Sequence, residues 1–217
     1  DIFCAVIDNF GDIGICWRLS RQLVSEHGVN VRLWVDDLAS FKRICPQINI
    51  DETQQTIAGV NIMLWSAHTS WAEYSVADVV IEALACTIPL TYQSRMAEHD
   101  VKPLWLNLEY LSAEDWVEGC HGLPSPQPHL PLDKHFFFPG FTAATGGLLQ
   151  EAALQQHAEN FTADEMAQQG FWQQLGVTDP GNYAQKISLF AYDHPQLSTL
   201  VNCWLQSGQT ILCLVPE

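Results

Sequence analysis

Apolar residues along this chain alternate between short continuous runs and runs with helical spacing. Residues 2–7 are almost uninterruptedly apolar, which is typical of a strand buried on both faces of a sheet. The next apolar or small positions recur with the spacing of an amphipathic helix: Ile13, Cys16, Trp17, Ser20, Leu23 and Val24. Gly28 is predicted to end this helix, and residues 29–35 supply a second strand.

The same alternation continues, less regularly, through the first half of the chain. Strand patterns are found at residues 57–65, 76–81 and 104–107, with helical or loop segments between them. Strands that alternate with helices predict a mostly parallel sheet covered on both faces. The fold class is therefore predicted to be α/β.

The second half begins with a proline-dense segment, residues 124–139, and a glutamine-rich stretch follows it. Thr162 and Glu165 have the spacing of a capping box that opens a helix. A turn cluster at residues 179–182 predicts a domain boundary, with a first domain and linker at 1–180. Strand patterns at 187–191 and 211–215 flank a helical pattern at 197–205, so residues 181–217 are predicted to begin a second sheet.

Both ends of the sequence lead us to expect a longer protein. Asp1 is followed at once by a strand, and the last predicted strand is followed by Pro216 and Glu217 alone. The composition, 47% hydrophobic and 16% charged among 217 residues, is that of a globular protein with a core. The sequence has neither a membrane-spanning apolar run nor a secretory leader, so we expect no membrane partner.

Charge and cysteine usage narrow the classes of function. The chain has 25 acidic and 9 basic side chains, without the clustered Lys and Arg of a nucleic-acid binder. Seven widely spaced cysteines form neither a disulfide framework nor a zinc motif, so a reduced, cytoplasmic protein is expected. A net charge of -16 suits a cationic partner or a guanidinium substrate, although acidity for solubility is also common.

The loop after the first predicted strand carries the clearest chemical signal. Asp8 and Asp12 flank a short glycine-containing segment where phosphate-binding loops often lie. The dinucleotide fingerprint is absent, and a phosphate would face two carboxylates at a cost on the order of several kcal/mol. We therefore expect a cation, a hydroxyl or a sugar edge here, with Asn9, Phe10, Gly11 and Gly14 as candidate substrate-binding neighbours.

Acidic residues also follow the other predicted strands. Because the carboxyl ends of parallel strands share one edge of the sheet, Glu82 and Glu109 are candidate binding residues there, with Tyr110 beside them. Structural interpretations are open as well: Asp12 could cap its helix, and Glu82 and Glu109 could be helix-start acids.

Several blocks resemble the elongation factor P arginine rhamnosyltransferases, and they span almost the whole chain in register. The blocks are residues 8–14 with Cys16-Trp17-Arg18-Leu19, 33–37, 79–82, Ala85-Cys86, 103–118, 124–126, 138–141 and 146–148.

The resemblance implies an inverting, metal-independent transferase of the GT-B type, with two facing Rossmann-like domains. The donor is then dTDP-L-rhamnose, and the acceptor is an arginine of elongation factor P. Asp8 and Asp12 match the essential carboxylates, with Asp12 as the base. Phe190 and Tyr192 match aromatic positions that contact the donor nucleotide. No cofactor and no metal are expected.

Two alternatives are left open by the sequence. The chain could belong to another GT-B transferase with a different sugar nucleotide, or it could be a non-catalytic module that binds a basic protein surface. The oligomeric state, the domain closure and the choice among the acidic candidates do not follow from the sequence.

Overall fold

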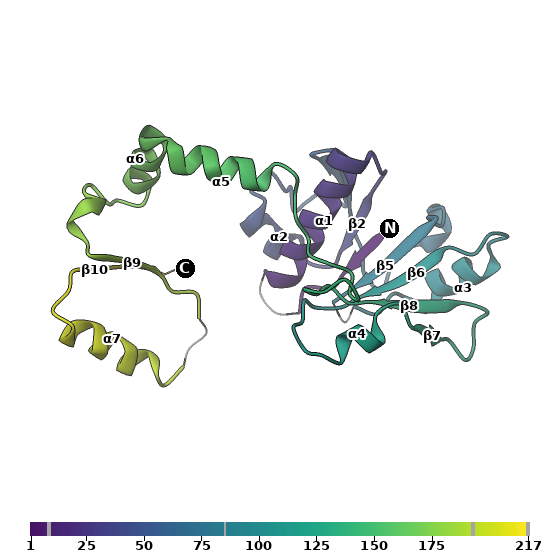
Figure 1. The fold of residues 1–217 in the computed structure, drawn as a ribbon. Helices are drawn as coiled ribbons and strands as arrows, with labels where there is room; N and C mark the ends of the chain where they lie inside the picture. Colours follow the sequence, from purple (N-terminus) through teal and green to yellow (C-terminus); the bar gives the residue numbers. More distant parts are fainter. Residues whose placement is uncertain (8–9, 85, 192–193, 216–217) are drawn as a thin grey trace. The chain divides into compact units, whose positions relative to one another are not determined.

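The computed structural model describes residues 1–7, 10–84, 86–191 and 194–215. The chain packs into two compact units, residues 1–152 and 153–217 (Figure 1). The two units divide after residue 152, whereas the predicted first domain with its linker runs to residue 180. The predicted domain bounds stay a prediction.

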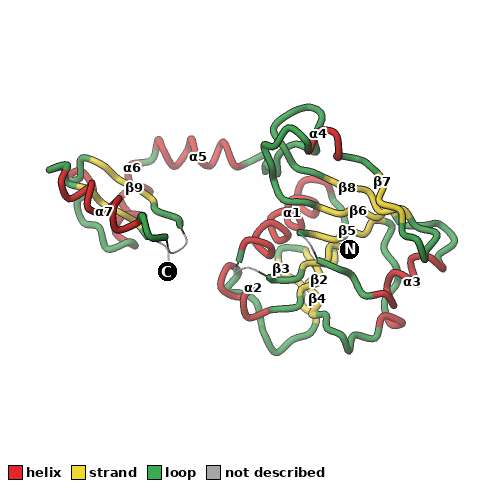
Figure 2. The backbone as a smooth tube through the Cα atoms, turned by 90° about the horizontal axis from the view of Figure 1, so that it is seen from below, coloured by secondary structure: helices red, strands yellow, loops and turns green. Residues whose placement is uncertain are grey.

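The first unit is built on one large sheet, in which the described residues form eight strands. Their order is β3-β4-β2-β1-β5-β6-β8-β7 (Figures 1 and 2). The six central strands are parallel, and β3 and β7 add antiparallel edges, which confirms the predicted mostly parallel sheet. The strand bounds are β1 Ile2–Cys4, β2 Arg32–Val35, β3 Gln54–Ile57, β4 Val60–Leu64, β5 Val79–Ala83, β6 Leu104–Leu108, β7 Pro124–Pro126 and β8 Asp133–Phe137.

Helices α1 (Gly11–His27) and α2 (Leu38–Ile44) cover one face of the sheet. Helix α1 buries Ile13, Cys16 and Trp17 against strand residues, as the helical spacing of its apolar positions predicts. Gly28 ends α1 with a φ of 64°, a left-handed conformation that glycine adopts without steric cost. The helix that carries Asp12 is therefore fixed at its end and along its buried face.

The opposite face of the sheet has an aromatic core under α3 (Leu90–Glu98) and the 3-10 turn η1 (Trp71–Glu73). The rings of Phe3 and Trp34 stack with centroids 5.8 Å apart, and Trp71 lies 4.9 Å from Trp34. Tyr92 of α3 packs edge-on against Phe3 at 5.0 Å. Successive residues of β1 thus serve two cores, because strand side chains alternate between the faces.

Several predicted strands have other bounds than the observed ones, and two of them have a clear physical reason. The first strand ends at Cys4 because the next amides turn to side chains: Val6 N–H donates to Asp36 at 2.9 Å, and Ile7 N–H donates to Asp12 at 3.3 Å. The pattern at 57–65 contains one shorter strand, β4, and its first residues are the end of β3 and the turn of the β3-β4 hairpin. Ala58 and Gly59 form its turn with φ angles of 51° and 79°.

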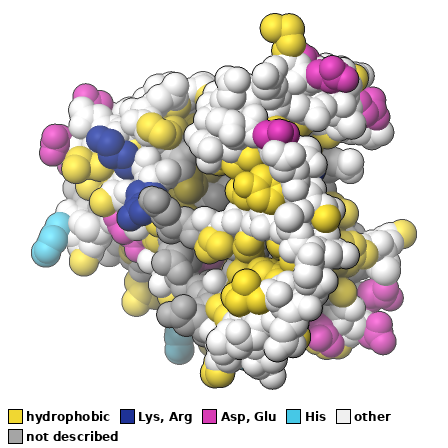
Figure 3. Space-filling view, turned by 90° about the vertical axis from the view of Figure 1, so that its left-hand side faces the viewer, with side chains coloured by type: hydrophobic (Ala, Val, Ile, Leu, Met, Phe, Trp, Pro, Cys, Tyr) yellow, Lys and Arg dark blue, Asp and Glu magenta, His cyan; other side chains and the backbone are white. Residues whose placement is uncertain are grey.

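The second unit contains helices α5 (Leu154–Ala163), α6 (Glu165–Gln174) and α7 (Leu197–Gln206), the 3-10 turn η2 (Pro180–Asn182), and parallel strands β9 (Gln185–Ser188) and β10 (Ile211–Leu214). The order β9-α7-β10 confirms the predicted strand, helix and strand. None of its described residues is fully buried. Large apolar side chains such as Met166 and Leu205 are exposed, and apolar surface shows in several places in the space-filling view (Figure 3). The described part of this unit is therefore a two-stranded sheet with helices and without a closed core.

The predicted capping box at Thr162 and Glu165 is wrong. Thr162 lies inside α5, where its hydroxyl donates to the Ala158 carbonyl at 2.8 Å. Asp164 begins α6 instead, and its carboxylate accepts from Ala167 N–H at 3.0 Å. An aspartate is as good an N-cap as a threonine, and Asp164 takes the position because α5 continues through Thr162.

Candidate functional site

The site predicted at the carboxyl ends of the strands centres on Asp12. This residue lies in the first turn of α1 and is 3% exposed. Its carboxylate accepts the Tyr110 hydroxyl at 2.8 Å on Oδ1 and the Ile7 amide at 3.3 Å on Oδ2. Both donors come from strand ends, Ile7 after β1 and Tyr110 after β6.

Asp12 is not the cap of its helix. Phe10 occupies the N-cap position, and no side-chain cap bond is found there among the described residues. A carboxylate in the first turn is still favoured by the helix dipole. The sequence left open whether Asp12 caps its helix or binds substrate. The structure excludes the capping role and shows a buried carboxylate that is held by groups outside its own helix.

The rest of the first loop is described in part. Asp8 and Asn9 lie outside the described residues. Gly11 and Gly14 have open space where a Cβ would be, so close packing does not account for either glycine. The Phe10 ring lies 5.3 Å below the guanidinium of Arg43, a cation–π contact. These residues remain candidate substrate neighbours.

Glu109 and Tyr110 follow β6 and are held close to the sheet. Glu109 N–H donates to the Phe137 carbonyl at 2.9 Å, which continues the pairing of β6 with β8. The Glu109 carboxylate accepts from the side-chain amide of Asn107. The Tyr110 side chain is 47% exposed although its hydroxyl reaches Asp12. The structure thus brings Tyr110 together with Asp12, while Glu109 pairs within its own strand end.

Glu82 occupies a different environment from Asp12. It is 2% exposed, and it pairs with Phe3 in the register of β1 and β5, so it faces the aromatic core. Its Oε1 accepts Ile88 N–H at 3.0 Å, and its Oε2 pairs with Lys134 Nζ at 2.7 Å. Helix α1 covers the other face of the sheet. The structure therefore does not bring Glu82 together with Asp12, and acceptor binding by Glu82 stays a prediction.

Four of the seven cysteines, Cys4, Cys16, Cys45 and Cys86, are buried, whereas Cys120 and Cys213 are partly buried and Cys203 is exposed. All seven lie in described ranges and are free thiols. Burial, followed by the nearby Glu82, raises the pKa of Cys86 to about 12. The pKa of Cys4 is also raised well above its ordinary value, mainly by a hydrogen bond with Cys16 and by burial. Within the described ranges, no three His, Cys, Asp or Glu side chains are grouped to hold a metal ion.

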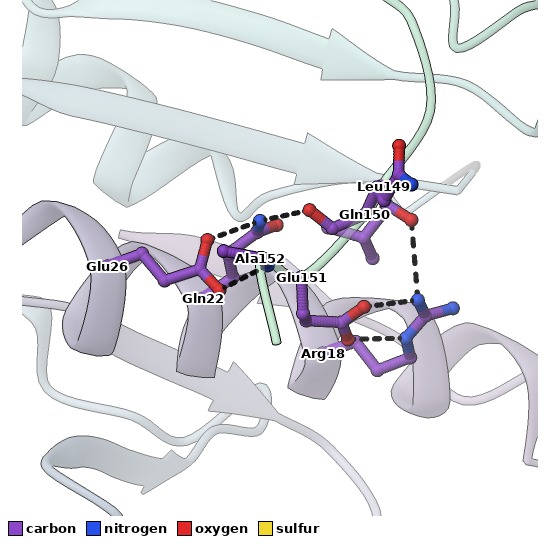
Figure 4. A network of polar contacts seen from close by, with 7 residues as sticks. All are labelled: Arg18, Gln22, Glu26, Leu149, Gln150, Glu151 and Ala152. Atoms are coloured by element: carbon purple, nitrogen blue, oxygen red, sulfur yellow. Dashed lines mark hydrogen bonds and ion pairs between the residues drawn. The ribbon is translucent and has the colours of Figure 1, made fainter. Parts of the chain in front are cut away.

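A strap of residues 148–152 lies along the outer side of α1, a feature that the sequence analysis missed (Figure 4). Arg18 donates to both Glu151 carboxylate oxygens, at 2.9 and 2.7 Å, and to the Leu149 carbonyl at 3.3 Å. Gln22 donates to the Gln150 carbonyl at 2.7 Å, and Glu26 accepts Ala152 N–H at 2.8 Å. The available signal was the four-residue spacing of Arg18, Gln22 and Glu26 on one helix face.

The strap also encloses an apolar cavity of about 340 Å³ between α1 and strands β5, β6 and β8. Leu19 and Leu23 of α1 form one wall, and Leu106, Phe137 and Leu148 form others. The strap is therefore held by two kinds of contact. Its polar bonds to α1 and its apolar contacts in the cavity fix the same segment against the helix that carries Asp12.

The predicted donor-site residues belong to the second unit. Phe190 follows β9 and is 88% exposed, and Tyr192 lies outside the described residues. Their proposed contact with a nucleotide stays a prediction. Within the described ranges, no helix has the length and apolar character needed to cross a membrane.

Known proteins resemble this chain over all of its length. A family model described as "Elongation-Factor P (EF-P) rhamnosyltransferase EarP" matches residues 1–217. The protein-arginine rhamnosyltransferase of Pseudomonas putida is 53% identical over 218 residues, covering 100% of this chain and 56% of the relative. That of Pseudomonas aeruginosa is 48% identical, covering 100% of this chain and 57% of the relative.

A solved structure described as "Structural basis for EarP-mediated arginine glycosylation of translation elongation factor EF-P" is also similar. It matches with a TM-score of 0.53 and 31% identity, over 100% of this chain and 48% of that chain. The chain thus spans about half the length of the curated relatives it matches. On the family match over every residue, the chain belongs to the EarP family of elongation factor P rhamnosyltransferases.

Proposed function

We propose that this chain is the acceptor-side part of an inverting glycosyltransferase that moves rhamnose from dTDP-L-rhamnose to an arginine of elongation factor P. The observation that carries the proposal is the family match over residues 1–217, in a chain that places the buried carboxylate of Asp12 at the sheet edge. Relatives named protein-arginine rhamnosyltransferase support the reaction class.

The chemistry of the acceptor explains the need for a carboxylate. A guanidinium is protonated at neutral pH and its lone pairs are delocalised, so it is a poor nucleophile. A carboxylate can orient one guanidinium nitrogen by a charge-assisted hydrogen bond. In the proposed step, this nitrogen attacks the anomeric carbon while the bond to the diphosphate oxygen breaks on the opposite face. The proton from nitrogen passes to Asp12 as the new bond forms.

The donor is proposed to bind a second Rossmann-like domain, facing the first in a GT-B arrangement. The parallel β9-α7-β10 unit supports this, because it has the strand, helix and strand order that begins such a domain. Phe190 and Tyr192 are the proposed nucleotide contacts. The leaving diphosphate is stabilised by helix and side-chain donors of that domain, and neither a metal nor another cofactor is required.

Elongation factor P is the proposed partner, in the cytoplasm. The net charge of -16 supports a cationic acceptor surface, and the similar solved structure concerns the arginine glycosylation of this factor. Charge alone does not identify a partner, since acidity also serves solubility.

The test is the intact mass of elongation factor P after incubation with dTDP-L-rhamnose and the whole protein. We expect the parent to add the mass of one deoxyhexose, and Asp12→Asn to add none at matched concentration. Asp51→Asn is the control, because Asp51 is an exposed acid that precedes β3, the edge strand three places from β1 in the sheet. Transfer from another sugar nucleotide alone would identify a different transferase. Partner binding without any covalent product would identify a binding module.

A further inference from the structure

One hydrogen bond links two parts of the site that are far apart in sequence. Tyr110 donates its hydroxyl proton to Asp12 Oδ1 at 2.8 Å, across 98 residues of chain. Tyr110 follows β6 and Asp12 begins α1 after β1, and β5 lies between these two strands. The bond therefore exists only when the strands have assembled in this order.

The segment that carries Tyr110 is anchored on both sides. Glu109 N–H donates to the Phe137 carbonyl at 2.9 Å, and Ser112 N–H donates to the Pro139 carbonyl at 3.3 Å. These bonds attach the segment to β8 and to the residues that follow it. A side chain held on a rigid backbone can fix the orientation of a neighbouring group better than one on a free loop.

The Asp12 carboxylate needs such support because its other donor among the described residues lies farther away. Ile7 N–H lies 3.3 Å from Oδ2, beyond the usual range for a strong N–H···O bond, whereas the Tyr110 bond is of ordinary length for O–H···O. A carboxylate has about four acceptor positions on its two oxygens. The two donors found among the described residues therefore leave acceptor positions for a guanidinium.

We propose that Tyr110 is a positioning residue that holds the Asp12 carboxylate in the orientation needed to take the acceptor proton. This inference rests on the proposed function, in which Asp12 is the base. Tyr110 keeps its own proton throughout: the guanidinium proton passes to an Asp12 oxygen, and the phenol remains a donor to the same carboxylate. The role differs from the substrate contact that the sequence predicts for Tyr110.

Steady-state kinetics of the whole protein with elongation factor P and dTDP-L-rhamnose test the proposal. Tyr110→Phe removes only the hydroxyl, and we expect kcat to fall about tenfold, the size of one hydrogen bond to a charged group. The acceptor KM is expected to stay within about twofold of the parent value, because a group acting in the chemical step does not alter ground-state binding. Tyr110→Leu, which also lacks the hydroxyl, is expected to lower kcat at least as much.

Tyr74→Phe is the matched control. Tyr74 packs edge-on against Trp34 in the aromatic core, away from Asp12, and its loss of a hydroxyl should leave kcat and KM unchanged. Thermal unfolding of each variant shows whether the fold is intact. A Tyr110→Phe variant that unfolds at the parent temperature but loses kcat supports positioning.

A double-mutant cycle shows whether Tyr110 acts through Asp12. Asp12→Glu moves the carboxylate by one methylene, so Tyr110→Phe is expected to cost less in that background than in the parent. Equal costs in both backgrounds would overturn the inference. So would a raised acceptor KM with unchanged kcat, which would make Tyr110 a substrate contact, or unchanged kinetics. If the parent itself transfers no rhamnose, the proposed function fails first and the inference falls with it.

Discussion

Glu82 of β5 and Lys134 of β8 form an ion pair across β6, with Oε2 and Nζ 2.7 Å apart. The carboxylate is 2% exposed, and the ammonium also lies 5.1 Å from the centre of the Trp105 ring on the intervening strand. Glu82 is further held by the Ile88 amide. The pair therefore ties three neighbouring strands together on the face opposite α1, and it gives Glu82 a structural role whatever it does toward substrate.

Breaking this pair from the lysine side should be costly. Lys134→Met removes the charge that compensates a buried carboxylate, and we expect the free energy of unfolding to fall by about 3 kcal/mol. Denaturant titration of the variant measures the loss. In the double variant Glu82→Gln with Lys134→Met no buried charge is left unpaired, so much of the stability should return. A double variant no more stable than Lys134→Met would contradict this account of the pair.

Close packing around Gly146, two residues before the strap, supplies a second prediction. A Cβ there would lie 2.4 Å from Cε1 of Phe137, whose ring is itself packed against His121 with centroids 5.1 Å apart. Gly146→Ala must displace that ring, and we expect a loss of about 1–3 kcal/mol in unfolding free energy. Gly119→Ala is the control: it lies in helix α4 (Val117–Cys120) with open space around it, and should be neutral or slightly stabilising. Equal stability of the two variants would show that the ring yields freely.

Thiol reactivity offers a third prediction. Cys203 is exposed, whereas Cys4 and Cys86 are buried with raised pKa values, that of Cys86 to about 12. Because the thiolate is the reacting form, iodoacetamide at pH 8 should modify Cys203 rapidly and leave Cys4 and Cys86 unmodified in the folded protein. Peptide mass mapping after a short pulse gives the order of modification. Early labelling of Cys86 would mean that the core beside Glu82 opens readily.

Much of the fold could be predicted from the spacing of apolar residues, because this spacing distinguishes a helix from a strand within one segment. Helix α1 and its end at Gly28 were predicted correctly, since buried spacing and a left-handed glycine both lie within one segment. The length of β1 was not, because Asp36 and Asp12 capture the amides of Val6 and Ile7. These side chains come from the end of β2 and from α1, so the pattern of residues 2–7 alone does not predict that they bind the amides.

The site divides in the same way. Asp12 stood out in the sequence because a glycine-containing loop between a strand and a helix is a local feature. The hydrogen bond between Asp12 and Tyr110 depends on the order of the strands in the sheet. The position of Glu82 on the face opposite α1 depends on the register of β5 with β1. Acidic residues after neighbouring strands reach the same edge of a sheet, but a shift of one residue sends a side chain to the other face.

The ion pair of the strap gives a pH dependence whose sign can be worked out. Arg18 holds the pKa of the Glu151 carboxyl at about 2, below its ordinary value of 4.5, by two hydrogen bonds. A depressed carboxyl pKa adds stability above the unfolded value, and this stability is lost as the pH falls through the folded value. Both side chains are partly exposed, 42% for Arg18 and 25% for Glu151, so we expect the pair to contribute only about 1 kcal/mol.

Unfolding free energies of the parent and of Glu151→Gln, compared at several pH values, measure this contribution. The difference should be constant between about pH 7 and pH 5 and should shrink steadily below about pH 4.5, because protonation of the parent then removes what the variant lacks. Glu98→Gln, at an exposed position on α3, is the control and should show little difference at any pH. A Glu151→Gln difference that persists unchanged at pH 3 would mean that the loss does not come from the charge of the ion pair. No difference at any pH would mean that the strap is held by its backbone bonds to Gln22 and Glu26.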